Sequence, residues 1–252
     1  MKLQIYSDLH LEFYKSFPKI ERKCDYLVLA GDIGKLSDVN YKEFIQYCSE
    51  NWKHTIVVLG NHEFYNCKNT YSKLLQKYNY YFSLFDNVTL LEKEKILLED
   101  YEIIGLTMWS YISETYKDLI NCPKKIKQYI LKNEKKRLVP IGYNGINILF
   151  EESKQWLLKN YNPNKKTIII THHPITQKNV CQDIYKHQSL ERTSVFSTNI
   201  ELNPNNTCIC ISGHTHFSHD FVDNNIRYIS NQMGYVDEIN DTNFNDSGLF
   251  II

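Results

Sequence analysis

The most informative absence is that of a long hydrophobic run. No segment of the 252 residues approaches the roughly 18 consecutive apolar residues needed to cross a bilayer. The first residues, MKLQIYSDLHLE, contain neither the apolar core nor the cleavage site of a signal peptide. We therefore expect a cytoplasmic protein without a membrane partner.

An excess of charge of one sign is also absent. Lys and Arg number 29 and Asp and Glu number 29, which gives a formal net charge of zero. Such a chain does not attract nucleic acid or anionic lipid over its whole surface, although a local basic patch still would. Composition thus gives no support to a nucleic-acid partner, and it leaves the oligomeric state open.

Cysteine occurs without any pairing pattern. The seven cysteines are an odd number, are scattered along the chain and form no C-x-x-C pair. Cys208 and Cys210 lie two residues apart on a predicted strand, so they face the same side. The ordinary interpretation is two small buried residues, and the alternative is a metal or redox role. Reducing, intracellular surroundings fit this pattern best.

The remaining composition is that of a globular protein. Hydrophobic residues make up 42% and charged residues 23%. The length fits one large domain, so we expect a single domain over 1–252. Within it, Ser110–Asn147 is lysine-rich and irregular, and we interpret it as a cap or insertion with a helix around Ile126–Lys136. Gln177–Pro204 has the character of a long polar loop.

Strands and helices alternate along much of the chain, which indicates an α/β protein. Continuous apolar runs such as YLVLA and TIVVL are typical of buried parallel strands. The predicted helices are Tyr41–Trp52, Thr70–Tyr81 and Glu151–Asn160. The predicted strands are Leu3–Ser7, Tyr26–Ala30, Thr55–Leu59, Val88–Leu91, Lys95–Leu98, Tyr101–Leu106, Thr167–Thr171, Thr207–Ser212, Ile226–Ser230 and Gly248–Ile252.

Five of these strands run directly into Asp, Asn or His residues. In open α/β sheets, ligands bind at the carboxyl ends of strands. Each motif alone has a simpler explanation, because Asp and Gly favour turns and helix caps and a single His is usually a satisfied polar group. Their joint occurrence in order indicates one site. Its members are Asp8, His10, Asp32, Asn61, His62, Glu63, His172, His214 and His216.

The residue types suit a pair of divalent ions. Carboxylate and amide oxygens favour Mn²⁺ and Mg²⁺, whereas imidazoles favour Zn²⁺, Fe and Mn²⁺. Two ions about 3.5–4 Å apart also need a bridging ligand, which a carboxylate supplies. We therefore expect two divalent metal ions, with Mn²⁺ favoured over Fe, Zn²⁺ and Mg²⁺.

The ordered set D-x-H, G-D, G-N-H-E, H and G-H-x-H resembles the calcineurin-like metallophosphoesterases, from residue 8 to residue 216. The resemblance implies a four-layer α/β/β/α sandwich of two mixed β-sheets flanked by helices. It implies that His62 is catalytic and that Glu63 orients it. It also implies the metal ligands: Asp8, His10 and His216 on the first ion, Asn61, His172 and His214 on the second, and Asp32 bridging both.

The activity that this resemblance implies is hydrolysis of a phosphomonoester or phosphodiester, such as a nucleotide or cyclic nucleotide. A water bridging both ions would attack phosphorus in line, and His62 would protonate the leaving oxygen or stabilise the transition state. A nuclease is the alternative among enzymes, and a protein-binding scaffold that has lost its ligands is the alternative outside them. Protein Ser/Thr phosphatases extend the second motif to G-D-x-V-D-R-G, whereas this chain has GDIGKL, which disfavours phosphoprotein substrates.

Several neighbouring residues allow two interpretations. His173 is an alternative ligand to His172, or else a residue of the substrate pocket. Trp109 and Tyr111 either pack in the core or stack on a substrate. Asn231 and Tyr235 either border the pocket or close the fold. We interpret His187 and His219 as solvated or structural. Lys124, Lys125 and Lys127 form either a solvated face or a contact to phosphate.

Overall fold

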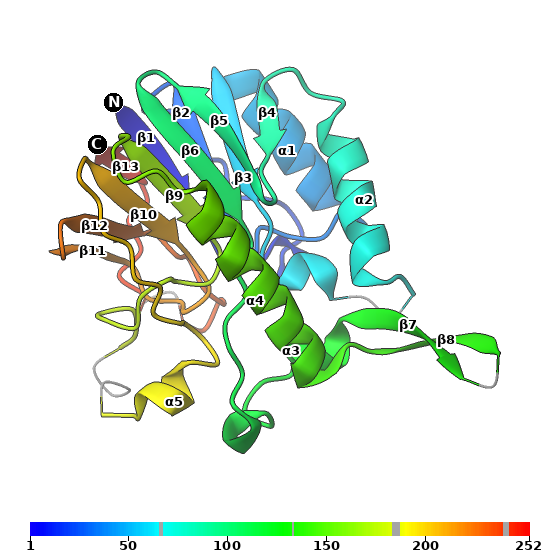
Figure 1. Cartoon of the computed structure of the whole chain (residues 1–252). Helices are drawn as coiled ribbons and strands as arrows, with labels where there is room; N and C mark the ends of the chain where they lie inside the picture. The colour runs from blue at the N-terminus through cyan, green and yellow to red at the C-terminus, as the bar shows by residue number, and fades with distance from the viewer. Residues whose placement is uncertain (66–67, 133, 183–186, 239–241) are drawn as a thin grey trace.

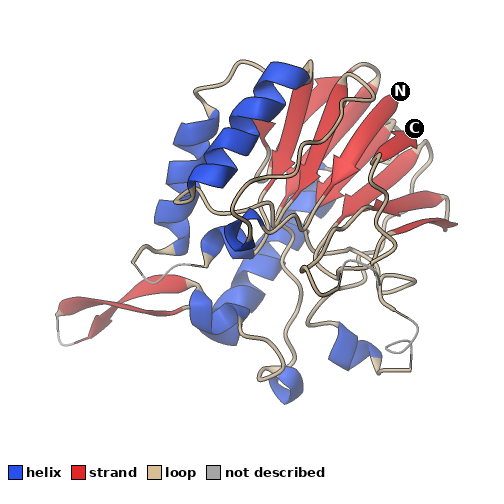
Figure 2. Cartoon of the chain, turned by 180° about the vertical axis from the view of Figure 1, so that it is seen from behind, coloured by secondary structure: helices blue, strands red, loops and turns tan. Residues whose placement is uncertain are grey.

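In the computed structural model, which describes residues 1–65, 68–132, 134–182, 187–238 and 242–252, two β-sheets pack face to face with helices outside them (Figures 1 and 2). This arrangement confirms the predicted α/β/β/α sandwich of two mixed sheets. The boundaries 1–252 of a single domain and the cap over 110–147 stay predictions.

The first sheet has five strands among the described residues, in the order β13-β1-β2-β3-β4. All neighbours are parallel except β13, which pairs antiparallel with β1. The bounds are β1 Lys2–Tyr6, β2 Tyr26–Ala30, β3 His54–Val58, β4 Val88–Leu90 and β13 Leu249–Ile251.

The second sheet has six strands in the described part of the chain, in the order β11-β12-β10-β9-β6-β5. Its four inner strands are parallel, and both edge strands, β11 and β5, run antiparallel. The bounds are β5 Glu94–Leu98, β6 Tyr101–Leu106, β9 Thr167–Thr171, β10 Cys208–Ser212, β11 His219–Asp223 and β12 Ile226–Ser230.

The alternation of side chains along the strands divides the core in two. Between the sheets, Ile5 and Val28 from the first sheet pack with Ile168 and Ile211 from the second. The intervening residues face outward into a larger core under the helices, where Leu29 packs. Strands buried on both faces explain the continuous apolar runs of the sequence.

Long helices cover the outer faces of the sheets (Figure 1). The helices α1 Val39–Asn51 and α2 Tyr71–Phe82 lie on the first sheet and confirm the predicted segments. The helix α4 Gly142–Asn160 flanks the second sheet, and it begins well before the predicted start at Glu151. Buried Ile146, Leu149 and Phe150 continue its apolar face, whereas the two glycines of its first turns hide the helical pattern.

The predicted helix around Ile126–Lys136 is wrong. This segment forms an antiparallel hairpin of β7 Lys127–Lys132 and β8 Lys135–Pro140, which projects from the body of the molecule (Figures 1 and 2). Tyr129 in β7 pairs with Leu138 in β8, and Gln128 pairs with Val139. The β-branched and aromatic residues of both segments favour strands over helices. A short helix, α3 Cys122–Lys125, precedes the hairpin.

The remaining described elements are short. In its described residues, the polar segment Gln177–Pro204 contains the helix α5 Leu190–Thr193. Short 3-10 turns lie at Leu11–Phe13, His62–Phe64 and Glu114–Tyr116. Cys208 and Cys210 are buried free thiols, which confirms the interpretation as buried strand residues. Within the described residues, no helix is both long and apolar enough to span a membrane.

Candidate active site

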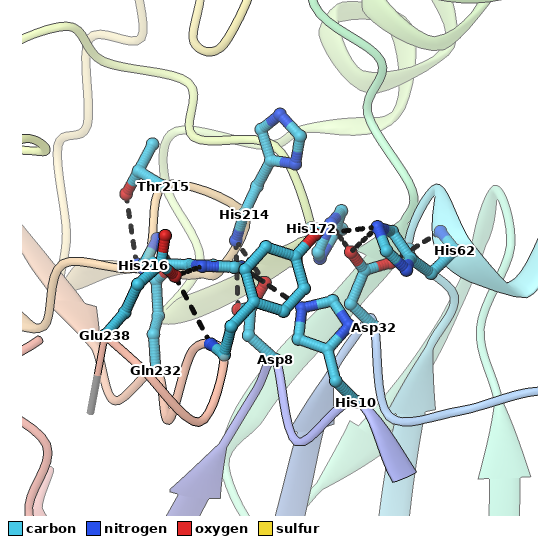
Figure 3. Close-up of polar contacts among 12 residues, drawn as sticks. Asp8, His10, Asp32, His62, His172, His214, Thr215, His216, Gln232 and Glu238 are labelled. Carbon is cyan, nitrogen blue, oxygen red and sulfur yellow. Dashed lines mark hydrogen bonds and ion pairs between the residues drawn. The ribbon is translucent and has the colours of Figure 1, made fainter. Parts of the chain in front are cut away.

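The polar residues that follow five strands meet at one edge of the sandwich. Strands β1, β2 and β3 of the first sheet lead to Asp8, Asp32 and His62, and strands β9 and β10 of the second lead to His172 and His214 (Figure 3). Because these strands are parallel within each sheet, their carboxyl ends lie on the same side. The sequence motifs are thus brought together by topology.

The backbone at the site is held in an unusual conformation. Five of the predicted ligands have positive φ angles, namely Asp8 at 54°, His10 at 46°, Asp32 at 53°, His214 at 75° and His216 at 51°. Left-handed backbone is uncommon outside glycine, and it persists where the surrounding structure fixes it, often at functional sites. Here it turns polar side chains inward immediately after β1, β2 and β10.

Two glycines of the motifs allow the loops to approach the carboxylates closely. A Cβ atom on Gly60 would lie 2.2 Å from Oδ1 of Asp32, and one on Gly213 would lie 2.6 Å from Oδ2 of Asp8. In this space, backbone N–H groups orient the carboxylates. The amide of His62 donates to Oδ1 of Asp32 at 2.7 Å, and the amide of His214 donates to the Asp8 carboxylate.

The side chains form four overlapping groups of potential metal ligands. Within each group, the ligand atoms lie within 4.8 Å of one another, and Asp8, His10, Asp32 and His172 each belong to two groups. Their connection makes one continuous cluster. The groups are Asp8, His10 and His216; Asp8, Asp32 and His172; His10, Asp32 and His62; and His172, His173 and His214.

The hydrogen bonds of two histidines fix which ring nitrogen faces the centre. Nδ1 of His172 donates to the carbonyl of Ala30 at 3.0 Å, and Nδ1 of His216 donates to Glu238 at 2.5 Å. The Nε2 lone pairs therefore point inward, 3.4 Å from Asp32 and from Asp8 respectively. An imidazole whose outer nitrogen donates to an oxygen is the usual state of a metal ligand.

The inward-facing atoms of His10 and Asn61 are also suitable ligands for a cation. Nε2 of His10 lies only 3.1 Å from Nε2 of His216, so two lone pairs would face each other unless a proton or a metal ion lay between them. Asn61 donates its Nδ2 to the hydroxyl of Tyr65 at 2.7 Å, and its Oδ1 lies 3.0 Å from Nε2 of His172. The amide oxygen of Asn61 is thus presented to the cluster. The donor set fits the two divalent ions expected from the sequence.

Charge is concentrated in the same small volume. Burial lowers the pKa of His172, but Asp32 outweighs burial and raises that pKa to about 9. Burial and the adjacent His172 lower the pKa of His173 to about 3. Despite burial, the nearby imidazoles hold the pKa of Asp32 well below its usual range. The ionised carboxylates that hold a proton on His172 attract a divalent cation in place of that proton.

The imidazole of His62 is held by a carboxylate other than the predicted one. Nδ1 of His62 lies 2.8 Å from Oε1 of Glu12, and Nε2 lies 3.2 Å from the hydroxyl of Tyr235. None of the hydrogen bonds among the described residues joins the Glu63 carboxylate to the His62 ring, and a role of Glu63 in orienting His62 stays a prediction. The Glu63 carboxylate instead accepts hydrogen bonds from the backbone amides of Gly60, Asp32 and other residues of the β2 loop. It holds two motif loops together.

The residues with two interpretations take distinct places. His172 lies beside Asp32 and Asn61. The His173 ring packs against His214 with centroids 3.9 Å apart and a tilt of 37°, and it borders a cavity. Trp109 is buried and borders the same cavity, as do Tyr235 and Lys125. Tyr111 is exposed. The Asn231 amide donates to the Ile5 and Asn245 carbonyls, which is a fold-closing role.

Sequence reasoning missed several residues that position this site. Glu12 carried a usable signal, because it continues the alternation of Asp8 and His10 two positions further on. Tyr65, four residues after Asn61, also follows its motif closely. Glu238 and Gln232, which accept from the Nδ1 and backbone amide of His216, lie far from any motif. No local sequence pattern predicts that Glu238 and Gln232 contact His216.

Comparison with known proteins agrees with this geometry. An uncharacterized protein of Acanthamoeba polyphaga mimivirus is 32% identical over 267 residues, covering 96% of this chain and 94% of that protein. The crystal structure of phosphopantetheinyl hydrolase from Mycobacterium tuberculosis has the same fold, with a TM-score of 0.65 and 16% identity over 100% of this chain and 95% of that chain. A family model described as calcineurin-like phosphoesterase matches residues 1–218. The chain therefore belongs to the calcineurin-like phosphoesterase family.

Proposed function

We propose that this protein is a dinuclear metal-dependent phosphoesterase that hydrolyses a small-molecule phosphoester. The observation that carries the proposal is the inward direction of the Nε2 lone pairs of His172 and His216, each fixed by a hydrogen bond at Nδ1. Both lone pairs point at buried carboxylates. When no metal is bound, these carboxylates hold a proton on each ring, and a divalent ion would take the place of those protons.

The ligands divide between two ions. Asp8, His10 and His216 form one buried group that would hold the first, and Asp32 would lie between the two. Asn61, His172 and His214 would hold the second. When bound, two divalent ions neutralise phosphate charge and make water a competent nucleophile at neutral pH. Mn²⁺ suits this mixture of carboxylate, amide and imidazole ligands best.

His62 supplies the proton for the leaving group. Its Nε2 borders the cavity, and Glu12 holds the opposite ring nitrogen at 2.8 Å. With Nδ1 held by the Glu12 carboxylate, Nε2 is the ring atom that donates a proton to the ester oxygen as its bond to phosphorus breaks. The hydroxyl of Tyr235, 3.2 Å from Nε2, keeps the ring directed at the substrate.

Hydrolysis of p-nitrophenyl phosphate in the presence of Mn²⁺ tests the proposal. We expect activity that a chelator removes and that Asp32→Ala abolishes. His62→Ala should lower kcat by roughly 10²–10⁴-fold, the usual contribution of a general acid. A non-catalytic scaffold would show none of this activity with any of Mn²⁺, Mg²⁺, Zn²⁺ or Fe²⁺, and that result would refute the proposal.

Nucleic acid is a second candidate substrate, favoured by one feature. Residues 124–137, which include most of the projecting hairpin, contain seven Lys or Arg and a single acid, Glu134, although the whole chain is neutral. Tyr129 and Leu131 on β7 are exposed beside these cations. Basic residues interleaved with an aromatic ring suit single strands. Cleavage of a single-stranded oligonucleotide that falls steeply with salt and is lost in Lys132→Glu, but not in Lys159→Glu, would favour this alternative.

A further inference from the structure

Two cavities meet at the metal-ligand cluster. The first, of about 280 Å³, reaches Asp32, Asn61 and His62. The second, of about 580 Å³, is lined by His214, Thr215 and His216 of the G-H-x-H loop. Both are bordered by Phe196, His214 and His216, so they share one wall at the site. A phosphorus atom held at the cluster would have one cavity on each side.

The first cavity is mainly apolar beyond the ligands. Trp109, Ile112, Ile120 and Ile146 line it, and they come from the strand end after β6, the predicted cap and α4. Its one cation among the described lining residues is Lys125, whose Nζ lies 4.5 Å from the ring centroid of Tyr65. This cavity suits a slender alcohol with an apolar body.

The second cavity is wider and more polar. Gln177, Gln188, Arg192 and Ser197 line it, with Leu119 and Val180 as apolar patches. Its volume falls within the roughly 300–1,000 Å³ of small-molecule sites. Arg192 is exposed on α5 and lines this cavity, and a guanidinium suits an oxygen-rich group. A sugar or nucleoside fits this chemistry.

We propose that the substrate is a phosphodiester, with an apolar alcohol in the first cavity and a polar, nucleoside-like group in the second. This inference rests on the proposed phosphoesterase function. A monoester has only one organic group and would use only one of the two cavities. A diester places a substituent in each while its phosphate stays at the cluster.

The position of His62 decides which ester bond breaks. His62 lines the first cavity and is not among the described residues that line the second. The alcohol in the first cavity therefore receives the proton and leaves. Water oxygen forms a new bond to phosphorus, the bond from phosphorus to the leaving oxygen breaks with its electron pair, and that oxygen takes the proton from Nε2. The products are the free alcohol and a phosphomonoester of the polar group, and water supplies the hydroxyl and the hydrogen.

Two p-nitrophenyl substrates with the same leaving group test the second cavity. Thymidine 5′-(p-nitrophenyl phosphate) carries a nucleoside, whereas p-nitrophenyl phosphate carries none. With Mn²⁺, we expect kcat/KM for the diester to exceed that for the monoester by about tenfold or more, since the nucleoside adds binding in the transition state.

A pair of variants on α5 locates the effect. Arg192→Trp fills the second cavity and should lower the diester-to-monoester ratio of kcat/KM by about tenfold. Leu190→Trp adds a similar side chain at a residue that is 65% exposed and does not line the cavity, so the ratio should stay unchanged. Circular dichroism of both variants checks that each is folded.

The octyl ester of thymidine 5′-monophosphate tests the direction of cleavage, because its two alcohols have similar intrinsic reactivity. We expect octanol and thymidine monophosphate. Octyl phosphate and thymidine as the main products would overturn the assignment of the cavities. A monoester hydrolysed as fast as the diester, with the same ratio in both variants, would overturn the diester proposal alone. No hydrolysis of any ester with metal would refute the phosphoesterase function and the inference with it.

Discussion

Nδ1 of His62 lies 2.8 Å from Oε1 of Glu12, although the two residues are 50 positions apart in the chain. Glu12 is buried, and hydrogen bonds from His10 and His62 outweigh burial to lower its pKa to about 2. The carboxylate is therefore ionised at any working pH. It holds Nδ1 of His62 and so fixes the orientation of the ring.

Glu12→Gln should lower kcat by roughly 10–100-fold, the usual effect of removing an orienting partner of a functional histidine. KM should change little, because Glu12 is not among the described residues that border the substrate cavity. Steady-state kinetics on p-nitrophenyl phosphate measure both constants. Glu21→Gln, at an exposed glutamate, is the matched control. An unchanged kcat in Glu12→Gln would show that Glu12 does not support catalysis through His62.

We expect Glu63 to stabilise the folded protein. Its carboxylate accepts backbone amides from Gly60 and from Asp32, Ile33 and Gly34, so Glu63→Ala leaves several buried donors unsatisfied. We expect a loss of roughly 3 kcal/mol or more in the free energy of unfolding. Urea denaturation of metal-free protein checks this value. A folded, equally stable variant with low kcat would restore the role predicted from the motif.

Gly60→Ala should weaken metal binding without adding a polar group. The new Cβ would lie 2.2 Å from Oδ1 of Asp32 and 2.5 Å from the Asp32 amide nitrogen, so the carboxylate must move. Isothermal titration with Mn²⁺ should show a loss of at least about tenfold in affinity, equivalent to about 1.4 kcal/mol. Gly142→Ala, where a Cβ meets no atom within 4 Å, should leave the affinity unchanged. Equal affinities in both variants would contradict the packing argument.

His219 should make stability depend on pH. Its Nδ1 donates to the carbonyl of Phe217, its Nε2 is buried without a hydrogen-bond partner among the described residues, and burial lowers its pKa from 6.5 to about 4. Because the folded pKa is depressed, the stabilisation is complete above the unfolded pKa and is lost as pH falls from about 6.5 toward 4. A shift of this size corresponds to roughly 3 kcal/mol.

The measurement is urea denaturation between pH 7.5 and 4, compared with His219→Asn, which keeps a donor for Phe217 but does not titrate. The stability difference between the two proteins should narrow or reverse toward low pH. Parallel pH profiles for the two proteins would show that His219 contributes nothing to the acid sensitivity.

The sequence predicts well where burial produces a strong pattern. Strands β2, β3 and β9 are buried on both faces, so their apolar runs are unambiguous, and the polar residues that follow them are easily recognised. The edge strand β11 was missed because it is only partly buried. Its hairpin signal was nevertheless present in Asn224 and Asn225, which both take positive φ as in a type I′ turn.

Long-range contacts explain the rest of what was missed. The hairpin β7–β8 lies on the surface, so no burial pattern distinguishes its Lys-rich strands from a helix. Glu63 occupies its motif position but turns toward backbone amides of another loop, a choice that depends on the three-dimensional path of that loop. Glu238 reaches His216 from 22 residues away. The spacing of residues along the sequence does not by itself predict such long-range contacts.

The most direct test of the central claim is the metal stoichiometry of the purified protein. Equilibrium dialysis against Mn²⁺, followed by elemental analysis, should find two ions per chain, and Asp32→Ala should lose binding at both sites because Asp32 lies between the two ligand groups. p-Nitrophenyl phosphate hydrolysis should rise in proportion to the bound metal. A folded wild-type protein that binds no divalent ion would contradict the account.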